Sequence, residues 1–203
     1  MAAFGYPISL EVTGRTAVVI GEEAVAQGKD RALASAGARV VVRSESDWTP
    51  EDLDGAFLCV AASSDPETRE GVFRAARERG VLVNVMDDVA RCDFAAPAVV
   101  RRGDLAIAVS TGGRSPALAR RLRRQLERQF GPEWEDALAA LGEVRTETLH
   151  ELPDLAERSR RWADALDVEE LTALVRAGRR DEAKARLRAR LLRRPEPDLA
   201  VAP

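Results

Sequence analysis

The chain contains few of the residues that mark several common protein classes. Only 4% of its 203 residues are aromatic, and these are not spaced as a platform on which nucleic-acid bases would stack. Its two cysteines, Cys59 and Cys92, form no Cys-x-x-Cys pair, and its one histidine, His150, has no partner at metal-ligand spacing. The sequence therefore predicts neither a disulfide framework nor a metal site. We expect Cys59 to pack as a small buried hydrophobe and His150 to lie on a helix surface.

Long runs of charge or of apolar residues are also missing. The net charge is only -3, whereas a general nucleic-acid binder is usually strongly basic, so nucleic acid is not expected as a partner. No run of about 18 or more apolar residues suggests a membrane span, and the N-terminus lacks the basic and apolar regions of a signal peptide. We therefore expect a soluble, cytoplasmic protein.

The first half of the chain alternates short apolar runs with helical patterns. This alternation predicts an α/β fold with a Rossmann-like, mostly parallel sheet and an antiparallel edge formed by a hairpin. Strands are expected at 16–20, 38–42, 57–62 and 81–85, helices at 25–36 and 66–79, and the hairpin strands at 98–100 and 105–109.

The second half is helical in character. Its first helical pattern carries leucines at successive i+4 steps, Leu118, Leu122 and Leu126, with arginines on its other faces. The last pattern contains Gly178 near a turn, and the tail from Arg194 is expected to be disordered. The four helical patterns span 116–130, 133–152, 155–166 and 168–192.

Three stretches suggest chemistry, and each also has an ordinary structural interpretation. Asp87 and Asp88 follow a predicted strand, where open α/β sheets bind ligands, although strand ends are often acidic turns. Gly21 opens a strand-to-helix turn of the kind that binds a pyrophosphate, but Glu22 and Glu23 stand where further glycines are expected. Each glutamate would repel a pyrophosphate by about 1 kcal/mol or less, so a vestigial fold is the alternative.

The third stretch is the hydroxyl- and glycine-rich loop 110–115, which is followed by Arg120 and Arg121. Its backbone amides and hydroxyls could hold carboxylates or phosphates. The alternative is a plain serine N-cap, with Pro116 at the first helical position.

Together these motifs resemble the precorrin-2 dehydrogenase / sirohydrochlorin ferrochelatase family, the dehydrogenase half of siroheme synthase. The resemblance covers about residues 3 to 130. It is carried by Gly21…Val25-Ala26…Lys29, Ala36-Gly37-Ala38, Ala61-Ala62-Ser63-Ser64-Asp65, Asn84-Val85-Met86-Asp87, Phe94-Ala95-Ala96-Pro97 and Ser110-Thr111-Gly112-Gly113-Arg114-Ser115-Pro116.

The resemblance implies a homodimer in which a Rossmann-like domain is followed by a dimerisation region and a C-terminal helical domain. The corresponding regions here are 1–109 for NAD binding, 110–148 for dimerisation, 149–193 for the helical domain and 194–203 for the tail. It also implies NAD-dependent oxidation of precorrin-2 to sirohydrochlorin, and in bifunctional members the insertion of ferrous iron to give siroheme.

The family's catalytic aspartate corresponds to Asp87, which could accept a proton in either step. Arg43 is an alternative reader of a 2′-phosphate, which would favour NADP. The expected cofactor-binding residues are Gly21, Ala24, Val25, Glu45, Ser46, Ala62 and Ser63. The expected substrate-binding residues are Ser110, Thr111, Gly112, Gly113, Arg114 and Ser115, which would hold tetrapyrrole carboxylates.

Two departures from the family pattern leave other functions open. Glu22 and Glu23 replace family glycines, which predicts weaker NAD binding. The segment between Val42 and Phe57 is short, so one strand of the sheet is expected to be missing. The alternatives are a chelatase that keeps Asp87 without a nicotinamide site, and a non-catalytic tetrapyrrole-binding dimer.

Overall fold

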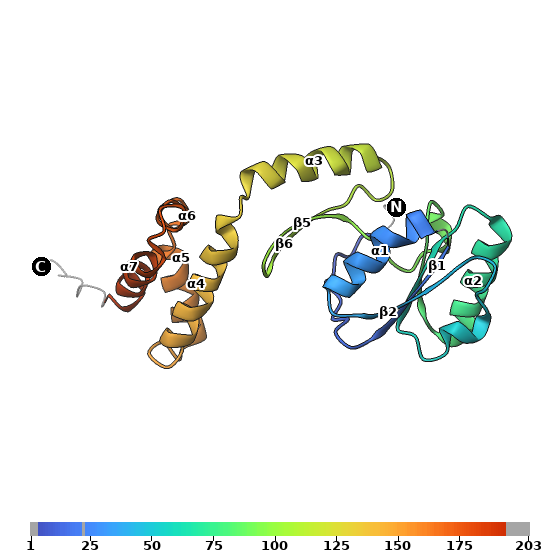
Figure 1. The fold of residues 1–203 in the computed structure, drawn as a ribbon. Helices are drawn as coiled ribbons and strands as arrows, with labels where there is room; N and C mark the ends of the chain where they lie inside the picture. Colours follow the sequence, from blue (N-terminus) through green and yellow to red (C-terminus); the bar gives the residue numbers. More distant parts are fainter. Residues whose placement is uncertain (1–3, 22, 194–203) are drawn as a thin grey trace, which may run out of the picture. The chain divides into compact units, whose positions relative to one another are not determined.

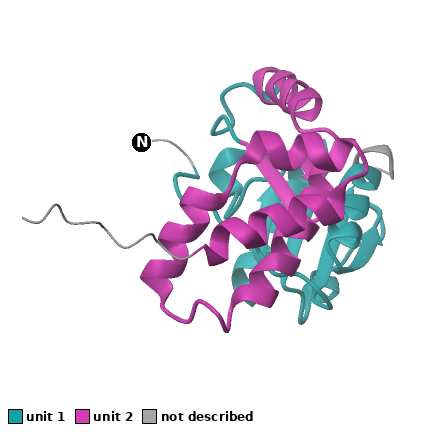
Figure 2. Ribbon diagram, turned by 90° about the vertical axis from the view of Figure 1, so that its left-hand side faces the viewer, with its two compact units in different colours: residues 1–97, 110–116 teal, residues 98–109, 117–203 magenta. Residues whose placement is uncertain are grey.

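The structure is a computed structural model that describes residues 4–21 and 23–193, with only the backbone described for residues 23–25. It contains two compact units, shown in Figure 2: residues 1–97 with 110–116, and residues 98–109 with 117–203. The hairpin assigned to the first region from the sequence thus belongs to the second compact unit. The roles assigned to the regions, dimerisation above all, remain predictions.

The first unit is built on a four-stranded parallel sheet in the order β2-β1-β3-β4 (Figure 1). Its strands follow the predicted apolar runs closely, which confirms the α/β fold. The bounds are β1 Thr16–Gly21, β2 Arg39–Arg43, β3 Leu58–Ala62 and β4 Leu82–Val85. All five residues of β3 are buried, as expected for a continuous apolar run inside a sheet that is covered on both faces.

Two helices cover opposite faces of this sheet, α1 (Glu23–Ser35) and α2 (Pro66–Arg79). Ile20 packs in one core cluster with Val72 of α2, whereas Val19 packs in a second cluster with Ala26 of α1. The two faces follow from the alternation of side chains along β1. Cys59 is fully buried in the α2-side cluster, as predicted.

Short connections hold the elements in register. The carboxylate of Asp65 accepts a hydrogen bond from the Thr68 backbone at 2.8 Å and so caps α2, which ends at Gly80 in a left-handed conformation.

Between β2 and β3 the described chain forms no strand, in line with the expected missing strand. A 3-10 helix, η1 (Pro50–Leu53), fills this segment and buries Leu53 completely.

The outer edge of β4 is covered by the chain that follows it. The Asp93 backbone donates to the Val83 carbonyl at 2.8 Å, and the Asp93 carboxylate accepts from the Val83 amide at 3.0 Å. The Asn84 side chain donates to the Phe94 carbonyl at 2.8 Å. These bonds take the place of a fifth strand and protect the edge. The prediction of an antiparallel hairpin at the sheet edge is therefore wrong.

The hairpin forms a two-stranded sheet of its own in the second unit, with strands β5 (Ala98–Arg102) and β6 (Leu105–Val109). Five helices follow in this unit: α3 Pro116–Gln129, α4 Glu133–Thr148, α5 Leu155–Ala165, α6 Val168–Arg176 and α7 Arg180–Leu192. Helices α4 to α7 share two apolar clusters, one containing Val144 and Leu191 and the other Ala137 and Leu174.

Two predictions about these helices need correction. The pattern 168–192 is not one helix, because Gly178, with φ +70°, separates α6 from α7. His150 is exposed as expected, but it lies in the turn after α4 rather than on a helix. None of the helices in the described residues has the length and apolar character needed to cross a membrane.

Candidate active site

The residues expected to bind the cofactor lie at the carboxyl ends of the parallel strands, as far as the structure describes them. In the parallel sheet β2-β1-β3-β4, the chain adds β2 on one side of β1 and β3 on the other, and open α/β sheets bind ligands at such a change of strand order. Gly21 ends β1 and Ala62 ends β3, and the two are register partners. Glu45 and Ser46 lie in the turn after β2, and Ser63 follows β3.

Gly21 has a structural requirement that is independent of any ligand. Its φ is +148°, and a Cβ atom added there would lie 2.1 Å from the carbonyl oxygen of Ala62. Only glycine allows the two strands to approach so closely at this point. The glycine at position 21 is therefore explained by strand packing as well as by the expected phosphate-binding turn. Glu22 lies outside the described residues, and Ala24 and Val25 lie in the first turn of α1.

The turn after β2 contains a carboxylate oxygen with unused hydrogen-bonding capacity. Glu45 Oε1 is buried and has no hydrogen-bond partner among the described residues. The nearby Arg43 is already engaged, since its Nε donates to Asp52 at 2.7 Å and its Nη1 to the Val42 carbonyl at 3.2 Å. The Ser46 hydroxyl is hydrogen-bonded to that of Ser44 at 3.0 Å. A buried acceptor without a partner, in a turn whose arginine is already paired, suits a hydroxyl group better than a phosphate.

Asp87 lies in a turn rather than on the strand tip. β4 ends at Val85, and Asp87 has φ +60°, a conformation that is uncommon for residues other than glycine and is enriched at functional sites. Its side chain is exposed, and no described residue hydrogen-bonds or pairs with its carboxylate. The side chains of Asp87 and Asp88 therefore do not alternate as they would along an extended strand.

The carboxylates of Asp87 and Asp88 differ in whether they form an ion pair. The Asp88 carboxylate lies 2.5 Å from Nη1 of Arg91, whose Nε also donates to Glu70 at 2.8 Å. Hydrogen bonding from this guanidinium, together with its charge, lowers the pKa of Asp88 below its usual value. Asp88 is thus held in an ion pair, whereas Asp87 remains available.

The expected substrate loop packs beside this turn, within the same unit. Gly112 and Gly113 have φ values of +58° and +78°. A Cβ atom on Gly113 would lie 3.1 Å from Cγ2 of Val89, the first residue of the short helix η2 (Val89–Arg91) after Asp88. Glycine at position 113 therefore lets the loop approach the segment that carries the two aspartates.

The hydroxyls of the loop hold its own backbone. Ser110 Oγ accepts from the Gly112 amide at 3.2 Å, and Thr111 Oγ1 accepts from the Ser115 amide at 3.2 Å. The Arg114 side chain is exposed. The loop thus presents a fixed backbone, with a cation at its surface, next to the Asp87 turn.

Sequence reasoning missed the groups that support this turn, namely Arg91, Cys92 and Asp93. The Asp88-x-x-Arg91 spacing could have indicated the ion pair, but nothing in the sequence indicates the contacts of Cys92. Across residues 4–21 and 23–193 there is no group of three or more His, Cys, Asp or Glu side chains that could hold a metal ion.

Comparison with known protein families gives two adjoining matches. Residues 8–98 match a family described as putative NAD(P)-binding. Residues 102–129 match a family described as sirohaem biosynthesis protein central. The first match contains the parallel sheet and Asp87, and the second contains β6 and α3.

Similar curated proteins are siroheme synthases. Siroheme synthase 1 of Pectobacterium atrosepticum is 34% identical over 205 residues, covering 92% of this chain and 42% of the relative. The siroheme synthase of Pseudomonas paraeruginosa is 35% identical over 204 residues, covering 91% of this chain and 44% of the relative. The chain therefore spans less than half the length of these relatives.

A solved structure described as SirC, precorrin-2 dehydrogenase, has the same fold. The TM-score is 0.68, and the match covers 90% of this chain and 98% of that one at 23% sequence identity.

Proposed function

This chain belongs to the precorrin-2 dehydrogenase / sirohydrochlorin ferrochelatase family, and we propose that it catalyses the NAD-dependent oxidation of precorrin-2 to sirohydrochlorin in siroheme biosynthesis. The observation that carries the proposal is the position of Asp87. It is an exposed carboxylate without a partner among the described residues, on a left-handed turn beside the Gly112-Gly113 loop.

The described residues fit a nicotinamide cofactor at the carboxyl edge of the sheet. The unpartnered Glu45 oxygen would accept a hydrogen bond from a ribose hydroxyl, and Ser46 and Ser63, whose hydroxyls hold the turns after β2 and β3, would lie beside the cofactor. Gly21 and Ala62, with Ala24 and Val25 at the start of α1, would line the path of the pyrophosphate. When bound, the cofactor supplies the hydride acceptor.

The charge at the end of β2 supports NAD rather than NADP as the proposed cofactor. A 2′-phosphate would meet the Glu45 carboxylate, while Arg43, the expected phosphate reader, is held by Asp52. Like charges at close range are repulsive, so the site favours NAD.

The chain's own residues would then handle the tetrapyrrole and its proton. The loop 110–115 would orient substrate carboxylates through its backbone amides, with Arg114 as a charged donor. Asp87 would accept the proton released from the ring, which is the role of a general base. The same carboxylate could take pyrrole protons if ferrous iron, as a substrate, enters sirohydrochlorin, so iron insertion is the second activity to assay.

We also propose that the protein is a cytoplasmic homodimer. On α3, Leu118 is 47% exposed and Leu122 is 36% exposed, one helical turn apart. Apolar residues in such a row indicate a surface that another chain covers. A second copy of this chain is the proposed occupant.

One experiment separates the proposed function from its alternatives. The purified chain is titrated with NAD and NADP and then given precorrin-2. We expect tighter binding of NAD, and formation of sirohydrochlorin with an equivalent amount of NADH. Iron insertion without nicotinamide binding would instead identify a chelatase. Tetrapyrrole binding without either reaction would identify a non-catalytic dimer.

A further inference from the structure

The thiol of Cys92 contacts both ends of the turn that carries Asp87. The Val85 amide donates to Sγ at 3.2 Å, and Sγ lies 3.1 Å from the carbonyl oxygens of both Val85 and Asp88. The Asn84 side-chain amide donates to Sγ at 3.4 Å. Because the thiol has one proton, it donates to one carbonyl at a time while it accepts from the amides. One side chain therefore joins the end of β4 to the residue after Asp87.

The turn needs such a support because Asp87 has φ +60°. A non-glycine residue stays in this conformation only where its surroundings hold it there. The backbone contributes one hydrogen bond across the turn, from the Asp88 amide to the Val85 carbonyl at 3.2 Å. No described residue fixes the Asp87 carboxylate directly. Its direction therefore depends on the backbone between residues 85 and 88.

Cys92 is itself held firmly and stays protonated. Its neighbour Asp93 is hydrogen-bonded to Val83 through both backbone and side chain, which fixes residue 92 against β4. Burial raises the pKa of the Cys92 thiol, and the charges of Asp88 and Asp93 raise it further. A neutral thiol can donate to a carbonyl oxygen, which a thiolate cannot do.

From this geometry, and on the basis of the proposed function, we propose that Cys92 is a positioning residue for the proton acceptor Asp87. It acts through the turn: by holding the ends of residues 85–88, it sets the direction of the Asp87 carboxylate toward the substrate.

The first test compares three variants by their kcat for precorrin-2 oxidation and their NAD affinity. Cys92→Ala should lower kcat about tenfold or more, because a displacement of about 1 Å in a catalytic group can cost up to about 100-fold. NAD affinity should stay unchanged. Cys92→Ser should restore most of the loss, since a hydroxyl also donates and accepts. Cys59→Ala, the same deletion at a fully buried position in β3, should keep the wild-type kcat.

The second test asks whether Cys92 acts through Asp87. In an Asp87→Asn background, Cys92→Ala should cause no further loss of kcat, because the two changes remove the same function. If the alanine variant does not fold, Cys92→Val replaces it. Valine fills the site without hydrogen bonds and suits the extended backbone of residue 92, with φ -121° and ψ 131°.

Three results would overturn this inference and leave the proposed function standing. They are a wild-type kcat in Cys92→Ala, a loss of kcat in Cys59→Ala equal to that in Cys92→Ala, or a loss of kcat on Cys92→Ala that is the same in the wild-type and Asp87→Asn backgrounds. A wild-type chain that binds precorrin-2 and NAD but does not oxidise the substrate would instead overturn the proposed function, and the positioning role with it.

Discussion

Gly21 and Ala62 approach each other so closely that a Cβ atom on Gly21 would lie 2.1 Å from the Ala62 carbonyl oxygen. This contact joins β1 to β3 at the point where the proposed cofactor would bind. We predict that Gly21→Ala lowers the free energy of unfolding by roughly 3 kcal/mol or more, because it adds a backbone clash to a strained φ.

Gly55→Ala is the matched control for this prediction. Gly55 also has a positive φ, +72°, but no atom lies within 4 Å of the position of an added Cβ. Its replacement should cost only about 1 kcal/mol, for the left-handed backbone alone. Urea denaturation measures both variants, and equal losses would show that the Gly21 contact is unimportant.

The glutamates beside Gly21 give a prediction that rests on the sequence. Glu22→Gly combined with Glu23→Gly should tighten NAD binding on the order of tenfold, if about 1.4 kcal/mol of repulsion and crowding is relieved. Calorimetric titration with NAD measures the change. Unaltered or weaker affinity would mean that these carboxylates do not face the pyrophosphate.

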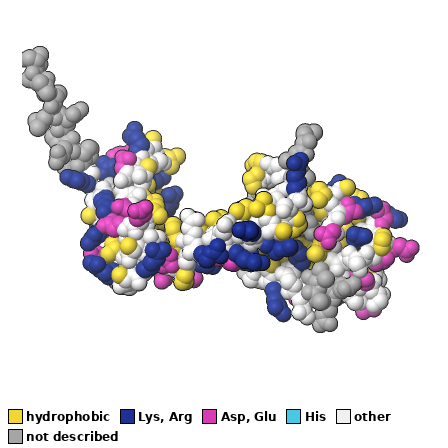
Figure 3. Space-filling model, turned by 90° about the horizontal axis from the view of Figure 1, so that it is seen from above, with side chains coloured by type: hydrophobic (Ala, Val, Ile, Leu, Met, Phe, Trp, Pro, Cys, Tyr) yellow, Lys and Arg dark blue, Asp and Glu magenta, His cyan; other side chains and the backbone are white. Residues whose placement is uncertain are grey.

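The two exposed leucines of α3 give a test of the proposed dimer. Leu118→Glu with Leu122→Glu should convert the dimer to a monomer, because two charges would be buried in an apolar interface. Figure 3 shows basic side chains, which on α3 are all arginines, gathered close to apolar ones. Arg124→Glu, on another side of α3, should leave the dimer intact. Sedimentation at micromolar concentration tests both, and a monomeric wild-type chain would contradict the proposed dimer.

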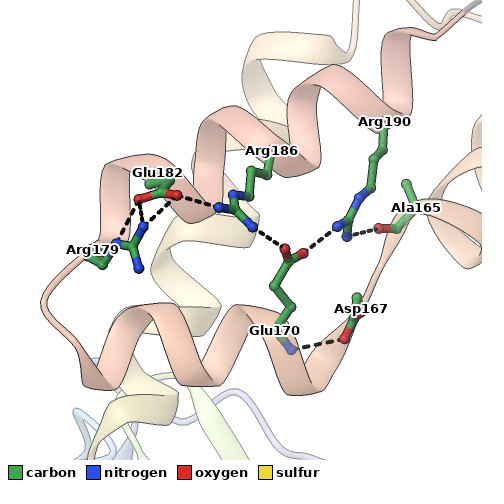
Figure 4. Close-up of polar contacts among 7 residues, drawn as sticks. All are labelled: Ala165, Asp167, Glu170, Arg179, Glu182, Arg186 and Arg190. Carbon is green, nitrogen blue, oxygen red and sulfur yellow. Dashed lines mark hydrogen bonds and ion pairs between the residues drawn. The ribbon is translucent and has the colours of Figure 1, made fainter.

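An ion network between α6 and α7 predicts a pH dependence of stability (Figure 4). Glu170 lies 2.6 Å from Arg186 and 2.5 Å from Arg190. The hydrogen bond from Arg186, followed by the other contacts with these arginines, lowers the pKa of Glu170 in the folded chain. Since the folded pKa lies below the unfolded value of about 4.3, the stabilisation is present above that value and is lost as the pH falls through the folded pKa.

The corresponding variant is Glu170→Gln, with Glu169→Gln as the control. Glu169 is the exposed neighbour, with no ion pair among the described residues. Thermal unfolding at pH 7 should show a lower Tm for Glu170→Gln only. The difference from wild type should shrink in strong salt and disappear in acid below the folded pKa. A difference that is independent of pH would contradict the ionic origin.

The sequence predicts best the parts of the fold that depend on local apolar pattern. The runs around Val18, Val60 and Val83 gave the strands because β-branched residues in short continuous runs suit a buried parallel sheet. Helix ends with clear signals, such as Asp65 before Pro66, were also located. These features need no knowledge of which segments pair with one another.

Features that depend on distant partners could not be predicted. The position of the hairpin depends on whether Asp93 or a strand pairs with the edge of β4, and local pattern does not decide between them. The left-handed turn at Asp87 is flanked by contacts that Cys92 and Arg91 make with residues 85 and 88. The Glu45 oxygen lacks a partner among the described residues, and Arg43 pairs with Asp52, nine residues away along the chain. Each is a tertiary outcome rather than a local preference.

The role of Asp87 is tested most directly by comparing Asp87→Asn with Asp88→Asn. Either change removes a carboxylate with little change of shape, but only Asp88 is paired, with Arg91 at 2.5 Å. The rate of precorrin-2 oxidation with saturating NAD is measured for both variants and for the wild type. Asp87→Asn should lower this rate about 100-fold or more, with NAD binding and dimerisation unchanged, and Asp88→Asn should lower it much less. Equal effects of the two changes, or near-normal turnover in Asp87→Asn, would contradict the proposed mechanism.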